Sequence, residues 1–207
     1  MNLNISDFLN TETKYTFEPE LLTHPNIPKP LHGLNPRTIK GQAWWDVKRR
    51  ASYAEKRYKC FACGCSPNED RIIQRLEAHE DYSINYLTGE VKLNRIVALC
   101  HSCHAFIHSG LLTLRYHKGE LSRDDTIFIF DRGFKILKDA NLKPWFGTAE
   151  VYADEFRSDL KSKAVQLRKE QDTTTSADWS DWHIVIDGRK HYTKFQSFED
   201  WQEHYKP

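Results

Sequence analysis

The chain has 207 residues, of which 39 % are hydrophobic and 13 % aromatic, which is enough for one ordinary domain or for a small module with extensions. No apolar run approaches the roughly eighteen residues of a membrane span and no signal peptide opens the sequence, so we expect a cytoplasmic protein with no membrane partner. The formal net charge of +1 does not by itself indicate nucleic-acid binding, which leaves local clusters of charge as the feature to follow along the chain.

Residues 1–40 are predicted to form an N-terminal arm. Prolines at positions 19, 25, 28 and 30 interrupt its polar segments, so we expect extended chain with one short helix around Ile5 to Leu9. Such an arm either wraps on the core or binds a protein partner, and the sequence does not choose between these.

A basic helix is predicted over residues 43–58, where apolar residues recur at roughly helical spacing. Its apolar side, formed by Trp44, Trp45, Val47, Ala51, Ala54 and Tyr58, is expected to pack on the segment that follows. The basic residues should then face outward and contact phosphates. The candidates for nucleic-acid binding are Lys48, Arg49, Arg50, Lys56 and Arg57. An ordinary solvated basic face is the alternative.

Two CxxC pairs, Cys60 with Cys63 and Cys100 with Cys103, predict one tetrahedral structural zinc ion bound by four thiolates. The segment between the pairs has few large apolar residues, so its core is small, and zinc can supply on the order of 10 kcal/mol of coupled binding and folding free energy. A disulfide framework is the alternative. Cys65 has no partner at a comparable spacing and is interpreted as a bystander.

Between and after these cysteines, the pattern predicts a strand from Arg71 to His79, a turn at residues 87–90, a second extended segment over 91–99 and a helix over 102–108 that Gly110 ends. On that helix, His104 and His108 are four residues apart and share a face. Together with His79 they offer three ligands for a second metal ion. His101 is expected to point away from this face.

The rest of the chain is predicted to be scaffold. A helical extension over 113–170 should contain helices at 127–140 and 148–170, followed by a polar linker at 171–180. Residues 181–207 should form a small module with strands at 183–186 and 191–195, a turn at Asp187-Gly188 and a capped helix from Ser197 to Tyr205. We expect this module to dock on the body or on a protein partner.

The stretches LEAHE and IVALCHSCHAFIH resemble the ββα-metal core of the HNH nuclease family, in the subgroup whose zinc is held by two CxxC pairs. The resemblance covers about residues 35–110 and includes NPRTIKGQAWWDVKRR, which is similar to the leader of phage and bacterial members. It implies an α+β fold with a treble-clef, ββα-metal zinc core at 41–112, flanking helices and a small C-terminal hairpin and helix. It also implies a metal-dependent endonuclease of phage or bacterial defence type that cuts DNA, most simply double-stranded DNA.

The resemblance assigns roles to individual residues. His79 would bind the catalytic ion (Mg²⁺, Mn²⁺, Ni²⁺ or Zn²⁺) together with His104 and His108, and Glu80 would activate water. In a shifted register His79 is the base, and His104 and His108 carry the metal. The family's central Asn position holds Arg95 here, which leaves Asn94, one place earlier, as the candidate.

Two other functions fit the same residues. One is a non-catalytic zinc module that binds nucleic acid. The other is a nuclease subunit of a larger defence complex, with its target chosen by another chain.

Overall fold

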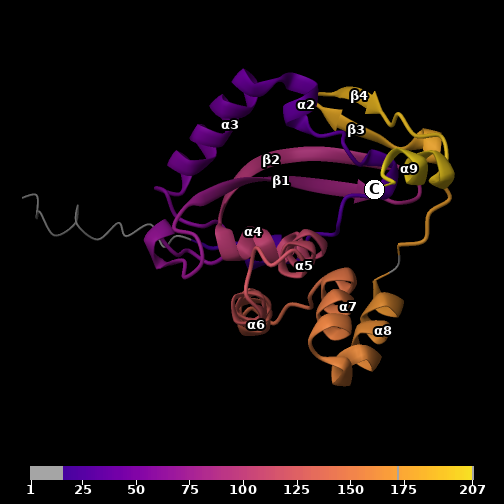
Figure 1. Ribbon diagram of the computed structural model, residues 1–207. Coiled ribbons are helices and arrows are strands. Elements are labelled where there is room, and N and C mark those ends of the chain that lie inside the picture. The colour runs from indigo at the N-terminus through magenta and orange to yellow at the C-terminus, as the bar shows by residue number, and fades with distance from the viewer. Residues whose placement is uncertain (1–15, 172, 207) are drawn as a thin grey trace, which may run out of the picture.

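The computed structural model describes residues 16–171 and 173–206, and it has a mixed α+β fold (Figure 1). Strands β1 (Leu76–Asn85) and β2 (Glu90–Cys100) form a long antiparallel hairpin. Strand β3 (His183–Ile186) pairs parallel with β2 and antiparallel with β4 (Arg189–Tyr192). The described chain thus contains a four-stranded sheet in the order β1-β2-β3-β4, and the C-terminal hairpin extends the sheet of the cysteine segment.

The first strand begins later than predicted. Residues 71–75 are not strand, because Asp70 anchors them as a loop: its Oδ1 accepts hydrogen bonds from the backbone N–H groups of Ile72 (2.9 Å) and Ile73 (3.3 Å). The other carboxylate oxygen of Asp70 accepts from the backbone N–H of Ser102 at 2.8 Å. Asp70 is only 1 % exposed, so this buried carboxylate ties the loop to the chain after the second CxxC pair.

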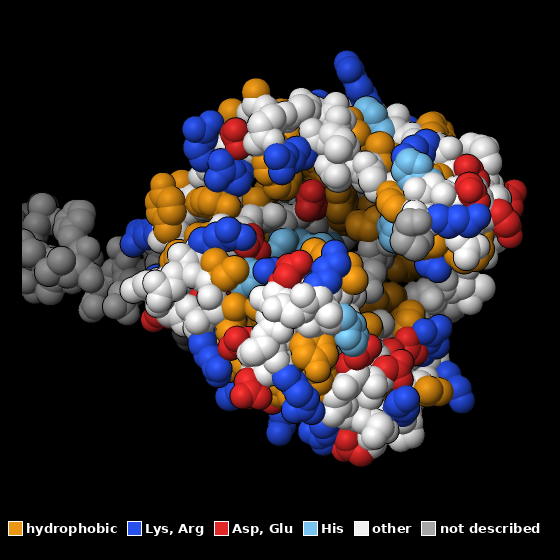
Figure 2. Space-filling model, viewed as in Figure 1, with side chains coloured by type: hydrophobic (Ala, Val, Ile, Leu, Met, Phe, Trp, Pro, Cys, Tyr) orange, Lys and Arg blue, Asp and Glu red, His pale blue; other side chains and the backbone are white. Residues whose placement is uncertain are grey.

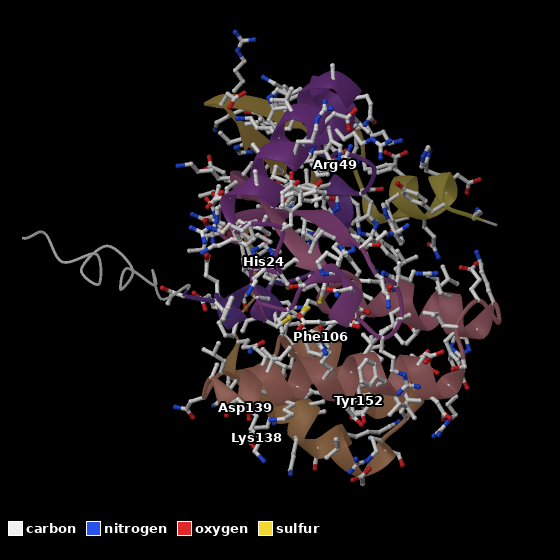
Figure 3. All side chains as sticks on the ribbon, turned by 90° about the vertical axis from the view of Figure 1, so that its left-hand side faces the viewer. His24, Arg49, Phe106, Lys138, Asp139 and Tyr152 are labelled. Atoms are coloured by element: carbon white, nitrogen blue, oxygen red, sulfur yellow. The ribbon has the colours of Figure 1, made fainter. Side chains whose placement is uncertain are left out.

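The sheet separates two sets of helices (Figures 1 and 3). On one side lie α2 (Pro36–Lys40) and α3 (Gln42–Glu55). On the other side lie α4 (His101–Ile107), α5 (Ser109–His117), α6 (Arg123–Asp139), α7 (Phe146–Glu155) and α8 (Lys161–Glu170). The chain ends with α9 (Phe198–His204). Figure 3 shows Arg49 on the α3 side of the sheet, Phe106 and Tyr152 on the other, and His24 between them.

Two predicted helix ends are corrected by the structure. The helix with His104 ends at Ile107, with His108 as its C-cap, but Gly110 lies inside α5 and does not terminate a helix. The helix predicted over 148–170 is two helices, α7 and α8, separated by the 3₁₀ turn Ser158–Leu160. Ser and Asp are poor residues for a helix interior, and the Asp159 carboxylate here accepts two hydrogen bonds from Arg157.

The buried residues form two cores that reach far along the chain. The larger core lies between the hairpin and α4, α6 and α7, where Gly133 of α6 lets the Phe106 ring approach so closely that a Cβ at residue 133 would lie 2.2 Å from it. The smaller core joins the arm to the C-terminal hairpin through Leu31, Val91 and Ile184.

The predicted arm is therefore largely part of the body. Its 3₁₀ turns at Pro19–Thr23 and Lys29–Leu31 bury Leu21, Leu22 and Leu31. The short helix expected at Ile5 to Leu9 lies outside the described residues. Among residues 16–171 and 173–206, no helix has the length and hydropathy of a membrane span.

Candidate metal centres

Four cysteines converge as their spacing predicts. Cys60 and Cys63 lie in the loop after α3, Cys100 ends β2 and Cys103 lies in the first turn of α4. Their Sγ atoms lie within 4.8 Å of one another, and those of Cys63 and Cys100 are 3.9 Å apart. Sulfurs bound tetrahedrally to zinc at about 2.3 Å lie about 3.8 Å apart. This group can therefore hold a structural metal ion such as zinc, and no disulfide joins the cysteines, all five of which are described.

The charge of this cluster has a partner in α6. Arg132 donates a hydrogen bond from Nη2 to Cys63 Sγ at 3.5 Å, and burial opposes but does not cancel the resulting rise in the pKa of Arg132. Hydrogen bonds from Cys100 and Cys103 lower the pKa of the Cys63 thiol. The fifth cysteine, Cys65, has its Sγ only 3.4 Å from that of Cys63 but does not belong to the four-sulfur group.

Three histidines form a second cluster between β1 and α4. The ring centroid of His79 lies 5.4 Å from that of His104 and 5.1 Å from that of His108, and those two rings are 4.6 Å apart. One nitrogen of each ring lies within 4.8 Å of the others. His79 is 4 % exposed, and neither of its ring nitrogens has a hydrogen-bond partner. Buried nitrogens are normally paired, and a shared metal ion would pair them.

The surroundings keep two of these imidazoles, those of His79 and His108, neutral. Burial and the facing rings of His108, His104 and His24 hold the pKa of His79 well below its usual value. Burial, with a contribution from His104, lowers the pKa of His108 to about 4. A neutral imidazole has the free lone pair that a metal ion requires, so His79 and His108 can act as ligands near neutral pH.

Glu77 orients one of the three histidines. It precedes His79 by two residues and so faces the same side of β1. Its carboxylate lies 2.7 Å from His104 Nδ1 and 3.1 Å from His101 Nδ1, and these hydrogen bonds hold the pKa of Glu77 below its usual value although burial opposes them. Each Nδ1 therefore donates, which leaves Nε2 of His104 as a free acceptor. His101 stays outside the three-histidine group, as predicted.

His24 also lies at the cluster, although it was not among the predicted site residues because it belongs to the segment expected to form an arm. Its ring centroid is 5.6 Å from that of His79. His24 Nε2 lies 3.1 Å from Asp81 Oδ1 and 3.2 Å from the backbone nitrogen of Tyr82, so the arm is fastened to β1 beside the cluster. No periodicity links residue 24 to residue 79; the available signal was a histidine in a segment that also carries the apolar pair Leu21-Leu22.

A small cavity of 60 Å³ lies beside the cluster and is lined in part by His24, His79, Glu80 and His108. Strand alternation puts Glu80 on the opposite face of β1 from His79, but β1 is an edge strand of the described sheet and Glu80 still reaches the cavity. Burial raises the pKa of Glu80, although a backbone hydrogen bond and His104 oppose this.

Imidazole-rich ligation suits Zn, Ni, Co or Mn, and a carboxylate beside it can accept a proton. No model of a protein family, no curated protein and no solved structure matches this chain.

Asn94 lies apart from the histidine cluster. The pairing of β1 with β2 shifts between Asp81 and Tyr82, so Asn94 is the unpaired residue of a β-bulge, and its amide donates to Ser83 Oγ at 2.9 Å. The neighbouring Arg95 is ion-paired with Glu18 and with Asp81, the latter at 3.0 Å. Neither side chain lines the 60 Å³ cavity.

Helix α3 packs on the hairpin, but with a different face from the predicted one. Trp45 and Ser52 are buried, whereas Val47 and Tyr58 are each 61 % exposed. Lys56, which directly follows α3, has only 19 % of its side chain exposed and its Nζ lies 5.2 Å from the centroid of the Phe61 ring, which corrects the expectation that it points outward.

The basic residues of this region fall into two groups. Lys48, Arg50 and Arg57 are exposed, and Arg50 bonds only a backbone oxygen, that of Asp46, among the contacts found for it in the described chain. Arg49 is half-buried and pairs with Asp46 at 2.9 Å, and Lys56 pairs with Glu18 at 3.2 Å. Lys48 and Arg50 are thus the charges best placed for phosphates.

Proposed function

We propose that this protein is a metal-dependent endonuclease of the HNH, ββα-metal type, built on a treble-clef zinc core, that hydrolyses phosphodiester bonds of DNA. One observation carries the proposal: three imidazoles meet between a β-hairpin and a helix whose first turn belongs to a four-cysteine cluster. The cysteine cluster anchors the start of α4, and the hairpin supplies His79 opposite it. The HNH resemblance of the sequence supports the same assignment.

Each side chain at the site has a role in this proposal. His79, His104 and His108 would hold the ion, and Glu77 orients His104. When bound, the ion supplies Lewis-acid stabilisation of the negative charge that grows on phosphate oxygens. Glu80, on the wall of the same cavity, accepts a proton from the attacking water. Its raised pKa makes it a stronger base than an exposed glutamate.

The burial of His79 supports this register over the one in which His79 is the base. A general base needs a nitrogen that reaches the attacking water, whereas both nitrogens of His79 are buried against the other histidines. His79 is therefore assigned as a ligand and Glu80 as the base. Lys48 and Arg50 of α3 would contact the phosphates of the duplex from the far side of the hairpin.

A second function is favoured by the position of Asn94. Because its amide is bonded to Ser83 and does not line the cavity, the central Asn role of the family motif is unfilled among the residues described at the site. This observation favours a zinc module that binds nucleic acid without cutting it, or a nuclease subunit that needs a partner chain.

Cleavage of supercoiled plasmid by the zinc-loaded protein, in Mg²⁺, Mn²⁺ or Ni²⁺ and in EDTA, tests the proposal. We expect metal-dependent cutting that His79→Ala and His104→Ala abolish, and that Glu80→Gln lowers by about a hundredfold or more. His117→Ala is the matched control, because His117 is 54 % exposed and pairs with Glu155 outside the cluster. DNA binding without cleavage in every metal, at one zinc per chain, would support the non-catalytic function.

A further inference from the structure

An aromatic pocket lies beside the histidine cavity. It has a volume of 320 Å³ and is lined by the rings of Tyr86, Trp145, Trp179 and Trp182. These residues come from the tip of the β1–β2 hairpin, from the start of α7 and from the segment that leads to β3, which lie at the same end of the molecule (Figure 1). Trp182 is buried, and its ring meets that of Tyr86 edge-on at 6.1 Å. Trp145 and Trp179 are only half-buried, so they form open walls.

The pocket also carries polar groups suited to a charged, hydrogen-bonding ligand. Asn26 is exposed, and its side-chain amide makes no hydrogen bond to any described residue. Lys29 is exposed at the rim, with its Nζ 4.8 Å from the centroid of Phe198 and 5.0 Å from that of Trp201. No acidic side chain lines the pocket among the described residues, so its charge is positive.

The aromatic pocket shares a wall with the histidine cavity. Asn26 lines both, Pro25 lines the cavity and Pro28 lines the pocket. Because proline fixes φ, this connecting wall is stiff. The Cα atoms of His24 and Pro28 are four residues apart in the chain and therefore lie at most about 14 Å from each other. Figure 2 shows the corresponding hollow, with His side chains on its floor and hydrophobic side chains further along it.

We propose that the aromatic pocket binds one unstacked nucleobase of the strand whose phosphate lies at the histidine cluster. This inference rests on the proposed function and names its substrate class: a nucleic acid with unpaired nucleotides next to the cleaved bond. Indole rings stack on any base, the Asn26 amide can both donate to and accept from a base edge, and Lys29 faces the backbone charge. A base inside a duplex is already stacked and would first have to leave the helix.

The size of the pocket supports this occupant. A volume of 320 Å³ is at the lower end of the range for small-molecule sites, which suits a single nucleotide and not a folded partner. An aromatic groove with prolines in its wall is also a place where a proline-rich peptide could dock. The positive rim and the shared wall with the histidine cavity favour the nucleobase.

Binding to the zinc-loaded full-length protein in EDTA-free buffer without added divalent metal tests the inference independently of cleavage. The probes are a short oligothymidylate, the blunt duplex of the same length and a polyproline peptide. Each probe is titrated into the protein at one salt concentration, and its binding is measured by the quenching of tryptophan fluorescence. We expect the oligothymidylate to quench and to bind about ten- to hundredfold more weakly to Trp145→Ala and Trp179→Ala, with duplex affinity unchanged. Tyr192→Ala, at an aromatic residue that is 57 % exposed on β4, should bind as the wild type does.

Two further measurements guard against unfolded variants. Asn26→Asp changes only an exposed side chain and should weaken the oligothymidylate selectively by adding a negative charge to the pocket. Replacing one nucleotide of the probe by an abasic residue should weaken binding to the wild type but not to Trp145→Ala.

The outcomes separate the two proposals. Plasmid cleavage with oligothymidylate binding that none of these variants changes would overturn the base pocket and leave the nuclease standing. Selective loss of binding in a protein that cuts nothing in any metal would support the pocket and overturn the nuclease. Quenching by polyproline alone would overturn the base pocket in favour of peptide docking.

Discussion

Replacement of His79 by leucine separates the stability that the fold loses by burying the histidine cluster from the stability that it gains when the cluster binds metal. In the protein without a second ion, both ring nitrogens of His79 are buried and unpaired. An unpaired buried polar group costs about 1–3 kcal/mol, and leucine fills a similar volume without polar atoms. We therefore expect His79→Leu to be more stable than the wild type by about 1–3 kcal/mol. For a chain of this length that corresponds to an increase in Tm of about 2–10 °C.

Adding metal should cancel most of this difference in stability or reverse it. An ion at a hundred times its Kd stabilises the wild type by about 2.7 kcal/mol, which raises its Tm by about 5–10 °C. The variant has lost one of the three ligands and should gain little. The assay is thermal unfolding of zinc-loaded protein with and without Mn²⁺, with zinc content checked at one per chain.

The control for both steps is His117→Leu, at a half-exposed residue paired with Glu155. It should keep the wild-type response to Mn²⁺. If His79→Leu is instead less stable than the wild type without Mn²⁺, the unpaired nitrogens of His79 do not destabilise the fold. If it still gains as much as the wild type from Mn²⁺, His79 is not a ligand.

Three other predictions follow from the charges and thiols. Cys63→Ser should lose zinc and unfold at 37 °C, whereas Cys65→Ser should retain one zinc per chain. Analysis of the metal content of both variants tests this, and equal loss of zinc in both would place Cys65 in the site. Hydrogen bonds from its arginine and lysine partners hold the pKa of Glu18 below 4.5 although burial opposes them. Glu18 therefore stabilises the fold above pH 4.5 and loses this effect as the pH falls through its depressed pKa. In urea unfolding, Glu18→Gln should lower the free energy of unfolding by about 1–2 kcal/mol at pH 7 and should leave it unchanged in strong acid. A difference in stability that persists in acid would contradict an origin in the ion pairs. Lys48→Ala with Arg50→Ala should reduce the slope of log affinity against log salt for duplex DNA by about 2, and an unchanged slope would show that these two charges do not contact phosphates.

Features set by neighbouring residues were predictable. A CxxC pair forces two sulfurs together over one turn, and residues four apart on a helix share a face, so the four cysteines and the pair His104 and His108 are found as expected. The Asp187-Gly188 turn is another such case, since both residues have positive φ and close a two-residue hairpin between β3 and β4.

Features that depend on distant contacts were not predictable from periodicity. The apolar face of α3 was misassigned because the residues that it buries include the polar Ser52, and because Lys56, which follows the helix, pairs with Glu18 from the arm. The first strand was placed too early because the sequence of residues 71–75 does not reveal that Asp70 holds them as a loop against Ser102.

By itself, the sequence determined which residues can bind metal, because ligand type and local spacing constrain the chemistry within a turn or two of chain. Only the tertiary structure decided what surrounds those ligands. Glu77 beside His104, His24 against His79, and the aromatic pocket between the arm and the C-terminal segment all join residues that share no periodicity. These neighbours come together because separate apolar segments bury the same two cores, and that burial is a property of the whole chain.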